Sequence, residues 1–93
     1  MARVAVHLLI TGRVQGVGYR AWMAREARRR ELAGWVRNRQ EGGVEAVVIG
    51  DAVAVEAMIE ACRRGPALAR VDQVARDPAM DDGAAGFEQR ATA

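Results

Sequence analysis

The sequence predicts an α+β fold in which two helices cover one face of a four- to five-stranded, mainly antiparallel sheet. The first observation is length: 93 residues suit a single domain spanning 1–93, because chains divide into separate cores only at larger sizes. The second is the order of patterns along the chain, β, α, β, β, α, β, followed by a short extra strand. The third is a short glycine turn between the middle two strands. Together they indicate a ferredoxin-like sandwich.

The N-terminal part predicts a strand, a loop and a helix. Val4 to Ile10 has apolar residues at every even position, which is the pattern of a strand with one buried face. Thr11 to Gly18 holds three glycines and is too apolar for a solvated linker, so we expect a compact loop. Arg20 to about Arg30 contains good helix formers, with small apolar residues on one side and arginines on another, and predicts the first helix.

The middle of the chain predicts a hairpin and a second helix. Gly34–Gln40 and Val44–Ile49 are rich in β-formers, and the turn at 41–43 is short enough to pair them antiparallel. Asp51 then stands at the N-cap position of a segment with apolar residues at helical spacing. Gly65, followed by proline, ends this second helix.

The C-terminal part predicts two strands joined by a turn. Leu68 to Asp77 has the composition of an edge strand, but Val71 and Val74 fall on opposite faces. Either a bulge intervenes or one valine is exposed. The Asp-Asp-Gly sequence at 81–83 predicts a mobile turn, and Phe87–Ala91 predicts a last strand.

The predicted topology brings two distant segments together. The first strand, first helix and second strand form a right-handed unit with the two strands parallel, and the third strand fits between them. The C-terminal ends of the first two strands then share one edge of the sheet. We therefore expect the glycine-rich loop to lie close to Asn38, near the end of the second strand.

Composition narrows the classes of partner. All 14 basic residues are arginine, and with 12 acidic residues they leave a net charge of only +2, too small to indicate a nucleic-acid partner. The single cysteine, Cys62, can form neither an internal disulfide nor a metal-ligand pair. The N-terminus leads directly into a strand pattern, and no apolar run approaches the roughly 20 residues of a membrane span. We expect a cytoplasmic monomer with no cofactor, metal, nucleic-acid or membrane partner.

The glycine-rich loop has the character of an anion site. Such a turn directs several backbone N–H groups at one point, and the dipole of the following helix adds positive charge there. Arg20, in the first helical turn, can hold a phosphate through two parallel hydrogen bonds. From spacing alone the signal is weak, because the glycines are also explained by chain reversal and Arg20 by being one of fourteen surface arginines.

Two motifs carry a family resemblance. The sequence GRVQGVGYR at 12–20 resembles the first signature of the acylphosphatase family. The sequence GWVRN at 34–38, followed by Gly42, Val44 and Gly50, matches the second. Two separate motifs in the right order are a specific signal, and they reverse the balance in favour of a functional loop.

The resemblance, which runs from about Val4 to about Val74, implies a fold and a reaction. It implies a ferredoxin-like sandwich that hydrolyses a small-molecule acyl phosphate to a carboxylate and inorganic phosphate. It further implies that Arg20 binds the phosphate and that Asn38 positions the attacking water. The implied substrate-binding residues, whose backbone amides form the cradle together with the arginine, are Gln15, Gly16, Val17, Gly18, Tyr19 and Arg20.

The sequence departs from the family pattern at two positions. Family members often end the first helix with glycine, where this chain has Glu31. The helix must therefore stop without a residue at ease at positive φ, or run slightly longer. Tyr19 stands where phenylalanine is commoner, and its hydroxyl requires water or a partner. Neither change affects Arg20 or Asn38.

The residue types near the loop also restrict the substrate. His7 lies five residues before Gly12, and no carboxylate cluster precedes Asn38, so we expect no general acid, general base or metal ligand there. Such a site cannot protonate a poor leaving group, whereas a carboxylate, with a pKa near roughly 4 to 5, leaves unaided at neutral pH. Because Asn38 cannot accept the proton of the water, a phosphate oxygen of the substrate is the expected acceptor.

Two other classes of function stay open on the sequence. One is a phosphate-binding module that keeps the cradle but does not catalyse turnover. The other is an RNA-binding domain on the same sandwich, which steep salt-dependent binding to single-stranded RNA would identify. Trp22 and Trp35 are better explained as core or rim residues than as base-stacking platforms, and His7 is expected on the open face of the sheet.

Overall fold

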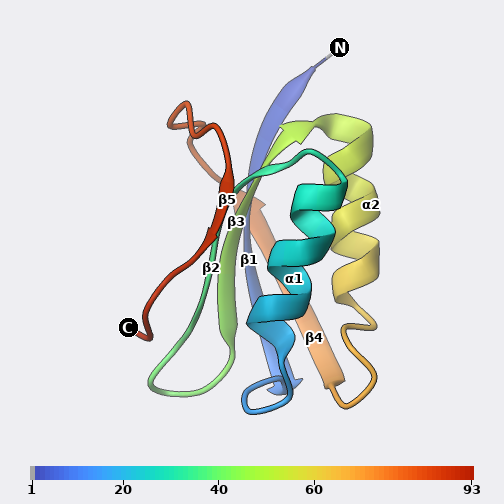
Figure 1. Ribbon diagram of the computed structural model, residues 1–93, viewed down its shortest axis with the longest axis vertical. Helices are drawn as coiled ribbons and strands as arrows, with labels where there is room; N and C mark the ends of the chain where they lie inside the picture. Colours follow the sequence, from blue (N-terminus) through green and yellow to red (C-terminus); the bar gives the residue numbers. More distant parts are fainter. Residues whose placement is uncertain (1) are drawn as a thin grey trace.

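Five strands form one sheet with both helices on the same face (Figure 1). The computed structural model describes residues 2–93. In chain order the elements are β1 Arg3–Arg13, α1 Tyr19–Arg29, β2 Ala33–Asn38, β3 Val44–Asp51, α2 Ala52–Cys62, β4 Arg70–Pro78 and β5 Phe87–Gln89. This is the predicted fold class. No helix in the described part of the chain is long and apolar enough to cross a membrane.

The sheet has the strand order β4-β1-β3-β2-β5. Strand β3 pairs antiparallel with both β1 and β2, so β1 and β2 run in the same direction, as predicted. The short strand β5 pairs parallel with the outer edge of β2 and makes the sheet mixed. As a consequence, the loop after β1 and the turn after β2 lie at the same end of the molecule, the lower end in Figure 1.

Strand β1 is longer than predicted. It continues through Thr11 and Gly12 to Arg13, so the irregular loop covers only 14–18 and not 11–18. Gly12 has a φ of 120°, and a Cβ there would lie 2.2 Å from the backbone oxygen of Arg70 on β4. Gly12 therefore allows the backbones of β1 and β4 to approach closely beside a bulge. Only the later glycines, Gly16 and Gly18, shape the loop.

The bulge resolves the two valines of β4. Consecutive residues of β1 pair with Gln73 and then Val71, which leaves Asp72 without a partner. The extra residue turns both valines toward the helix side: Val74 is 7% exposed, and Val71 packs partly buried against the core. Of the two alternatives raised by the sequence, the bulge is correct.

The first residue of α1 fixes that helix to α2. Tyr19 is buried, and its hydroxyl donates a hydrogen bond of 2.6 Å to the carbonyl oxygen of Cys62, the last residue of α2. Burial raises the pKa of the Tyr19 hydroxyl well above its usual range and that of the Cys62 thiol to about 12. The ring also meets Trp22 edge-on, with centroids 5.3 Å apart. The extra hydroxyl thus has a partner, and Trp22 packs against the core as expected.

The helix boundaries follow the predicted signals, with one difference. Asp51 caps α2 by accepting a hydrogen bond from the N–H of Val53 at 3.2 Å. At the end of α1, the N–H of Leu32 donates to the carbonyl of Ala27 at 2.8 Å, and Glu31 itself has a φ of 59°. The helix therefore does end in a left-handed residue, although that residue is a glutamate rather than glycine.

We expect Glu31→Gly to stabilise the protein. The left-handed conformation costs a residue with a Cβ about 1–2 kcal/mol, which glycine does not incur. Part of this stabilisation is offset because glycine has more conformational freedom to lose from the unfolded chain. The net increase in the free energy of unfolding is about 0.5–1 kcal/mol, measurable by denaturant titration. Glu31→Ala is the control, because it removes the carboxylate but keeps the Cβ, and it should give no increase. Equal stabilisation by both variants would contradict the backbone explanation.

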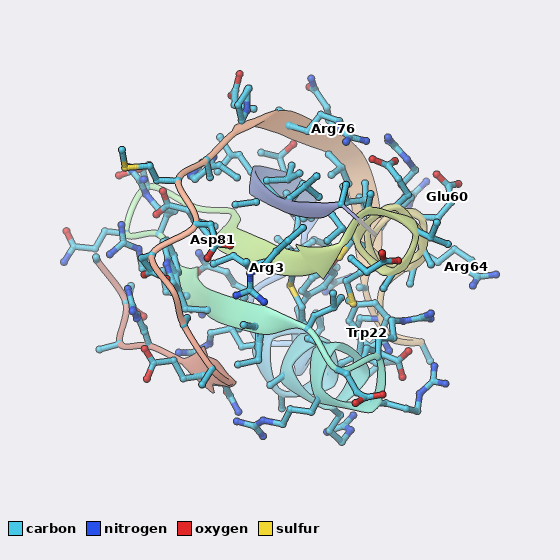
Figure 2. The ribbon with its side chains drawn as sticks, turned by 90° about the horizontal axis from the view of Figure 1, so that it is seen from above. Arg3, Trp22, Glu60, Arg64, Arg76 and Asp81 are labelled. Carbon is cyan, nitrogen blue, oxygen red and sulfur yellow. The ribbon has the colours of Figure 1, made fainter. Side chains whose placement is uncertain are left out.

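The segment between β4 and β5 lies at the opposite end from the 14–18 loop (Figure 1). Figure 2 shows Arg3 and Asp81 side by side, and their side chains form an ion pair with an Nε to Oδ2 distance of 2.5 Å. The other oxygen of Asp81 accepts from the N–H of Gly83 at 3.0 Å, which forms the predicted turn. This segment is thus held to the start of β1, far from the glycine-rich loop.

Candidate active site

The 14–18 loop is shaped by two left-handed glycines. Gly16 has a φ of 74° and Gly18 a φ of 78°, and a Cβ added at either position would meet no atom within 4 Å. Left-handed residues between right-handed ones turn successive N–H groups toward a common concave side. Gly18 is also the N-cap of α1, so the loop leads directly into the helix N-terminus. The two glycines therefore give the loop the irregular backbone that such an arrangement of N–H groups requires.

The backbone N–H groups of this loop are available to a ligand. Within residues 2–93, none of the N–H groups from Gln15 to Arg20 donates to a protein acceptor, and the first helical bond runs from Trp22 to the carbonyl of Gly18, at 3.0 Å. No side chain caps α1, and its first turn contains no acidic residue. Six consecutive donors at the positive end of a helix dipole favour an anion.

Arg20 is placed beside this run of donors and reaches the outer edge of β2. Its guanidinium donates to the carbonyl of Arg90 at 3.4 Å, which is a long and weak hydrogen bond. The N–H of Arg90 in turn donates to the carbonyl of Val36 at 2.8 Å. The guanidinium therefore lies near the end of β2, and because this partner is a neutral carbonyl, its positive charge stays available for an anion.

Asn38 is the last residue of β2. Val36 is fully buried beneath the helices, and side chains alternate along a strand, so Asn38 projects toward the same face as α1. Its backbone carbonyl accepts from the N–H of Ala93 at 3.2 Å. The residues after β5 thus run beside the end of β2 and border the site. The sequence held no signal for this border, because strand pairing between distant segments leaves no local pattern.

A second contact joins the loop to the turn after Asn38. The side-chain nitrogen of Gln15 donates to the carbonyls of Arg39 at 2.7 Å and Gly43 at 2.8 Å. The predicted convergence of the glycine-rich loop with the end of β2 is therefore present in the structure. The side chain of Gln15 was not singled out by the sequence, where only its backbone amide was placed in the site.

The remaining predicted binding residues face the site through their backbone alone. The Tyr19 side chain is buried and bonded to Cys62, so only its N–H is directed to the loop. The side chain of Val17 packs partly buried against the core. Of the residues predicted for the site, Gln15, Val17 and Tyr19 have side chains held by other parts of the protein, whereas Arg20 makes a long hydrogen bond to the Arg90 carbonyl.

Glu45 is a residue near the site that the sequence analysis missed. It lies on the open face of β3 and is only 7% exposed. It contacts Nε2 of His7 at 2.7 Å and accepts from Nε of Arg37 at 2.8 Å and from Arg39 at 3.2 Å. The two arginines flank Asn38 in sequence, so this cluster holds the open-face side of β2. An acidic residue inside the otherwise apolar strand was a signal that could have identified it.

The Glu45 cluster predicts a pH dependence of stability. Burial by itself raises the pKa of the Glu45 carboxyl, but hydrogen bonds from His7, Arg37 and Arg39 outweigh burial and lower the pKa to about 2 from an ordinary 4.5. A lowered folded-state pKa stabilises the protein above pH 4.5, and this stabilisation is lost as the pH falls through 4.5 toward 2.

We therefore expect Glu45→Gln to lower the free energy of unfolding at pH 6 by up to about 3 kcal/mol. The difference between wild type and variant should shrink as the pH falls from 5 to 2, since the protonated carboxyl then resembles the amide. Urea titrations of both proteins at several pH values measure it. A difference that stays constant down to pH 2 would show that the charge of Glu45 does not contribute.

The polar groups of the loop and of Arg20 are donors suited to an anion. They are backbone N–H groups and a guanidinium, and these groups cannot coordinate a cation. In the part of the chain that the structure describes, no three His, Cys, Asp or Glu side chains are grouped as metal ligands.

Comparison with known proteins identifies the family. Residues 6–89 match the family model described as Acylphosphatase. The chain is 55% identical over 89 residues to an acylphosphatase of Acidiphilium cryptum, covering 96% of this chain and 98% of the relative. A solved acylphosphatase of Coxiella burnetii superposes with a TM-score of 0.91 at 30% identity, covering 95% of this chain and 93% of its own. A solved acylphosphatase of Bacillus subtilis superposes with a TM-score of 0.91 at 33% identity, covering 94% of this chain and 98% of its own. This chain therefore belongs to the acylphosphatase family of hydrolases.

Proposed function

We propose that this enzyme hydrolyses the carboxyl–phosphate bond of acyl phosphates by an amide cradle, an arginine and a positioned water, without a metal. The observation that carries the proposal is the run of unpartnered N–H groups from Gln15 to Arg20, which leads directly into the helix that carries Arg20. The Arg20 guanidinium contacts Arg90, whose N–H in turn donates to Val36 on β2, the strand that ends at Asn38. Family membership supports the reaction class, and the local chemistry supports the roles below.

Phosphate binding is assigned to the loop and Arg20. The N–H groups of Gln15 to Tyr19 form the cradle, and the planar guanidinium of Arg20 holds two phosphate oxygens in parallel. The weak bond from Arg20 to the Arg90 carbonyl is easily exchanged for stronger, charge-assisted bonds to phosphate. The charge that develops on the transferring phosphoryl group is then stabilised by donors that are already oriented.

Asn38 is assigned to the attacking water. Its amide oxygen can accept a hydrogen bond from water and direct the oxygen of that water onto phosphorus, a positioning effect. The new P–O bond forms as the bond from phosphorus to the acyl oxygen breaks, and its electron pair leaves with the carboxylate. The proton of the water passes to a phosphate oxygen, since a neutral amide cannot hold it.

The leaving group determines the substrate class. A carboxylate is a weak base and departs without protonation, whereas the alkoxide of a phosphate monoester requires a general acid. The two titratable groups of the cluster nearest β2, Glu45 and His7, lie on the open face of the sheet and contact each other. They lie on the other side of the sheet from the face toward which Asn38 projects. Mixed anhydrides are therefore the proposed substrates.

Phosphate release from benzoyl phosphate tests this function. We expect steady turnover that inorganic phosphate inhibits competitively and that a chelator does not change. Glycerol phosphate, a monoester whose alkoxide leaving group requires protonation, is the control and should not be hydrolysed above the uncatalysed rate. Phosphate binding without turnover would instead identify a non-catalytic phosphate-binding module. Salt-sensitive binding of single-stranded RNA without turnover would identify an RNA-binding domain.

A further inference from the structure

The side chain of Gln15 links the two halves of the site. Its Nε2 lies 2.7 Å from the carbonyl oxygen of Arg39 and 2.8 Å from that of Gly43. Both partners are acceptors, so the atom facing them must be the amide nitrogen, and both of its hydrogens are used. The contact is therefore a two-point clamp of defined orientation.

The two acceptors belong to the ends of one turn. Arg39 and Gly43 begin and end the turn between β2 and β3, which is closed by a hydrogen bond from the N–H of Arg39 to the carbonyl of Gly43 at 3.1 Å. Asn38 immediately precedes this turn. Gln15, by contrast, is the first residue of the cradle. The clamp thus joins the start of the cradle to the residue directly after Asn38.

Segment 15–18 of the loop makes few other hydrogen bonds to the rest of the protein. Within residues 2–93, the other hydrogen bond of the segment 15–18 is the carbonyl of Gly18 accepting from Trp22, which belongs to the start of α1. Gly16 and Gly18 allow the backbone wide freedom. Apolar packing of Val14 and Val17 fixes the depth of the loop in the core. The Gln15 clamp is the polar contact that sets the loop's position along the strand edge.

We propose that Gln15 is a positioning residue, which holds the phosphate cradle in register with Asn38 through hydrogen bonds to Arg39 and Gly43. This inference rests on the proposed function, because it assigns phosphorus to the cradle and water to Asn38. The distance between the two reactants depends on the relative position of these segments, and a displacement of about 1 Å can cost 10²-fold in rate. Gln15 acts through Asn38 and makes no side-chain contact with the substrate.

The first test is Gln15→Ala, assayed with benzoyl phosphate. We expect kcat to fall about 10- to 100-fold. The inhibition constant for inorganic phosphate should change less than about threefold, because Arg20 and the N–H groups keep their positions relative to one another while the loop shifts relative to Asn38. The matched control is Gln40→Ala, which removes the same amide from an exposed position in the β2–β3 turn and should keep wild-type kcat. Unchanged kcat in Gln15→Ala would overturn the proposal.

A double-mutant cycle separates positioning from general stability. If Gln15 acts through Asn38, adding Gln15→Ala to Asn38→Ala should lower kcat by less than about twofold further, because the water is already unpositioned. Additive losses would show that Gln15 acts independently of Asn38 and would overturn the proposal. Thermal denaturation of each variant confirms that the assays are made on folded protein.

Gln15→Glu keeps the size of the side chain and provides a second test that does not depend on Gln15→Ala folding. The carboxylate cannot donate to the two carbonyls, whereas its protonated form can donate to one. We expect kcat at neutral pH to be as low as in Gln15→Ala and to rise as the pH falls toward 5, with no such rise in Gln15→Ala or wild type. A pH profile parallel to that of wild type would overturn the clamp.

The proposed function and the inference fail in different ways. If wild type does not hydrolyse benzoyl phosphate, or if Asn38→Ala retains full kcat, the proposed function is wrong. If wild type is active and Asn38→Ala is impaired while Gln15→Ala is normal or additive, the function stands and only the positioning role is wrong.

Discussion

Replacing Arg20 with alanine is expected to abolish catalysis and product inhibition together. Arg20 directly follows the unpartnered N–H groups in sequence, and within residues 2–93 its guanidinium makes one weak hydrogen bond, to the neutral carbonyl of Arg90. Its removal takes away the one side-chain cation assigned to the phosphate, so the transition state loses charge-assisted bonds that the amides cannot replace. We expect kcat/KM to fall by about 10³-fold or more, in the range for an arginine that stabilises phosphoryl transfer. Phosphate release and phosphate inhibition measure the two effects.

Two further variants establish the geometry of this effect. Arg20→Lys should recover little, because an ammonium is a point charge and cannot bind two phosphate oxygens in parallel. Arg25→Ala removes an exposed arginine of the same helix and should leave kcat/KM unchanged, which controls for net charge. Near-normal activity in Arg20→Lys would contradict the two-point grip on phosphate.

Replacing Asn38 with alanine should separate catalysis from binding. Asn38 projects from the last position of β2 toward the helix face, whereas the cradle and Arg20 do not depend on its side chain. We expect kcat to fall about 10²- to 10³-fold, the usual cost of losing one preorganised polar group. The inhibition constant for phosphate should stay almost the same.

The length of the amide side chain provides a control for Asn38. Asn38→Gln retains the amide but displaces it by one methylene, so it should recover little of the lost kcat if the effect is positional. A collapse of phosphate affinity in Asn38→Ala would identify Asn38 as a binding residue, contrary to the role assigned to it.

The sequence predicted those features that local patterns encode. Alternation and helical spacing gave the order of elements, and the hydrogen bond of Asp51 to Val53 confirms the start of α2. The position of Asn38 near the glycine-rich loop followed from the handedness of β-α-β units. These features depend on residues close together in sequence or on general rules of chain topology.

Features that depend on distant partners were not predictable in the same way. Thr11 and Gly12 have loop-like composition, yet they extend β1 because β4 pairs with them. Glu31 was expected not to fit positive φ, but the C-terminal hydrogen bonds of α1 hold it there. The side chain of Gln15 bonds to Arg39, and Glu45 bonds to three side chains. These contacts join separate segments of the chain, and no local pattern in the sequence indicates them.

The sheet order has a consequence for synthesis of the protein. The first strand to be translated, β1, is flanked in the sheet by β3 at 44–51 and β4 at 70–78. At roughly 5–20 residues per second, the two hydrogen-bonding edges of β1 wait several seconds on the ribosome before both neighbouring strands exist. The central part of the sheet therefore cannot form until β4 has been translated. Mutations that weaken β4 should increase aggregation during expression even where they lower the free energy of unfolding only slightly.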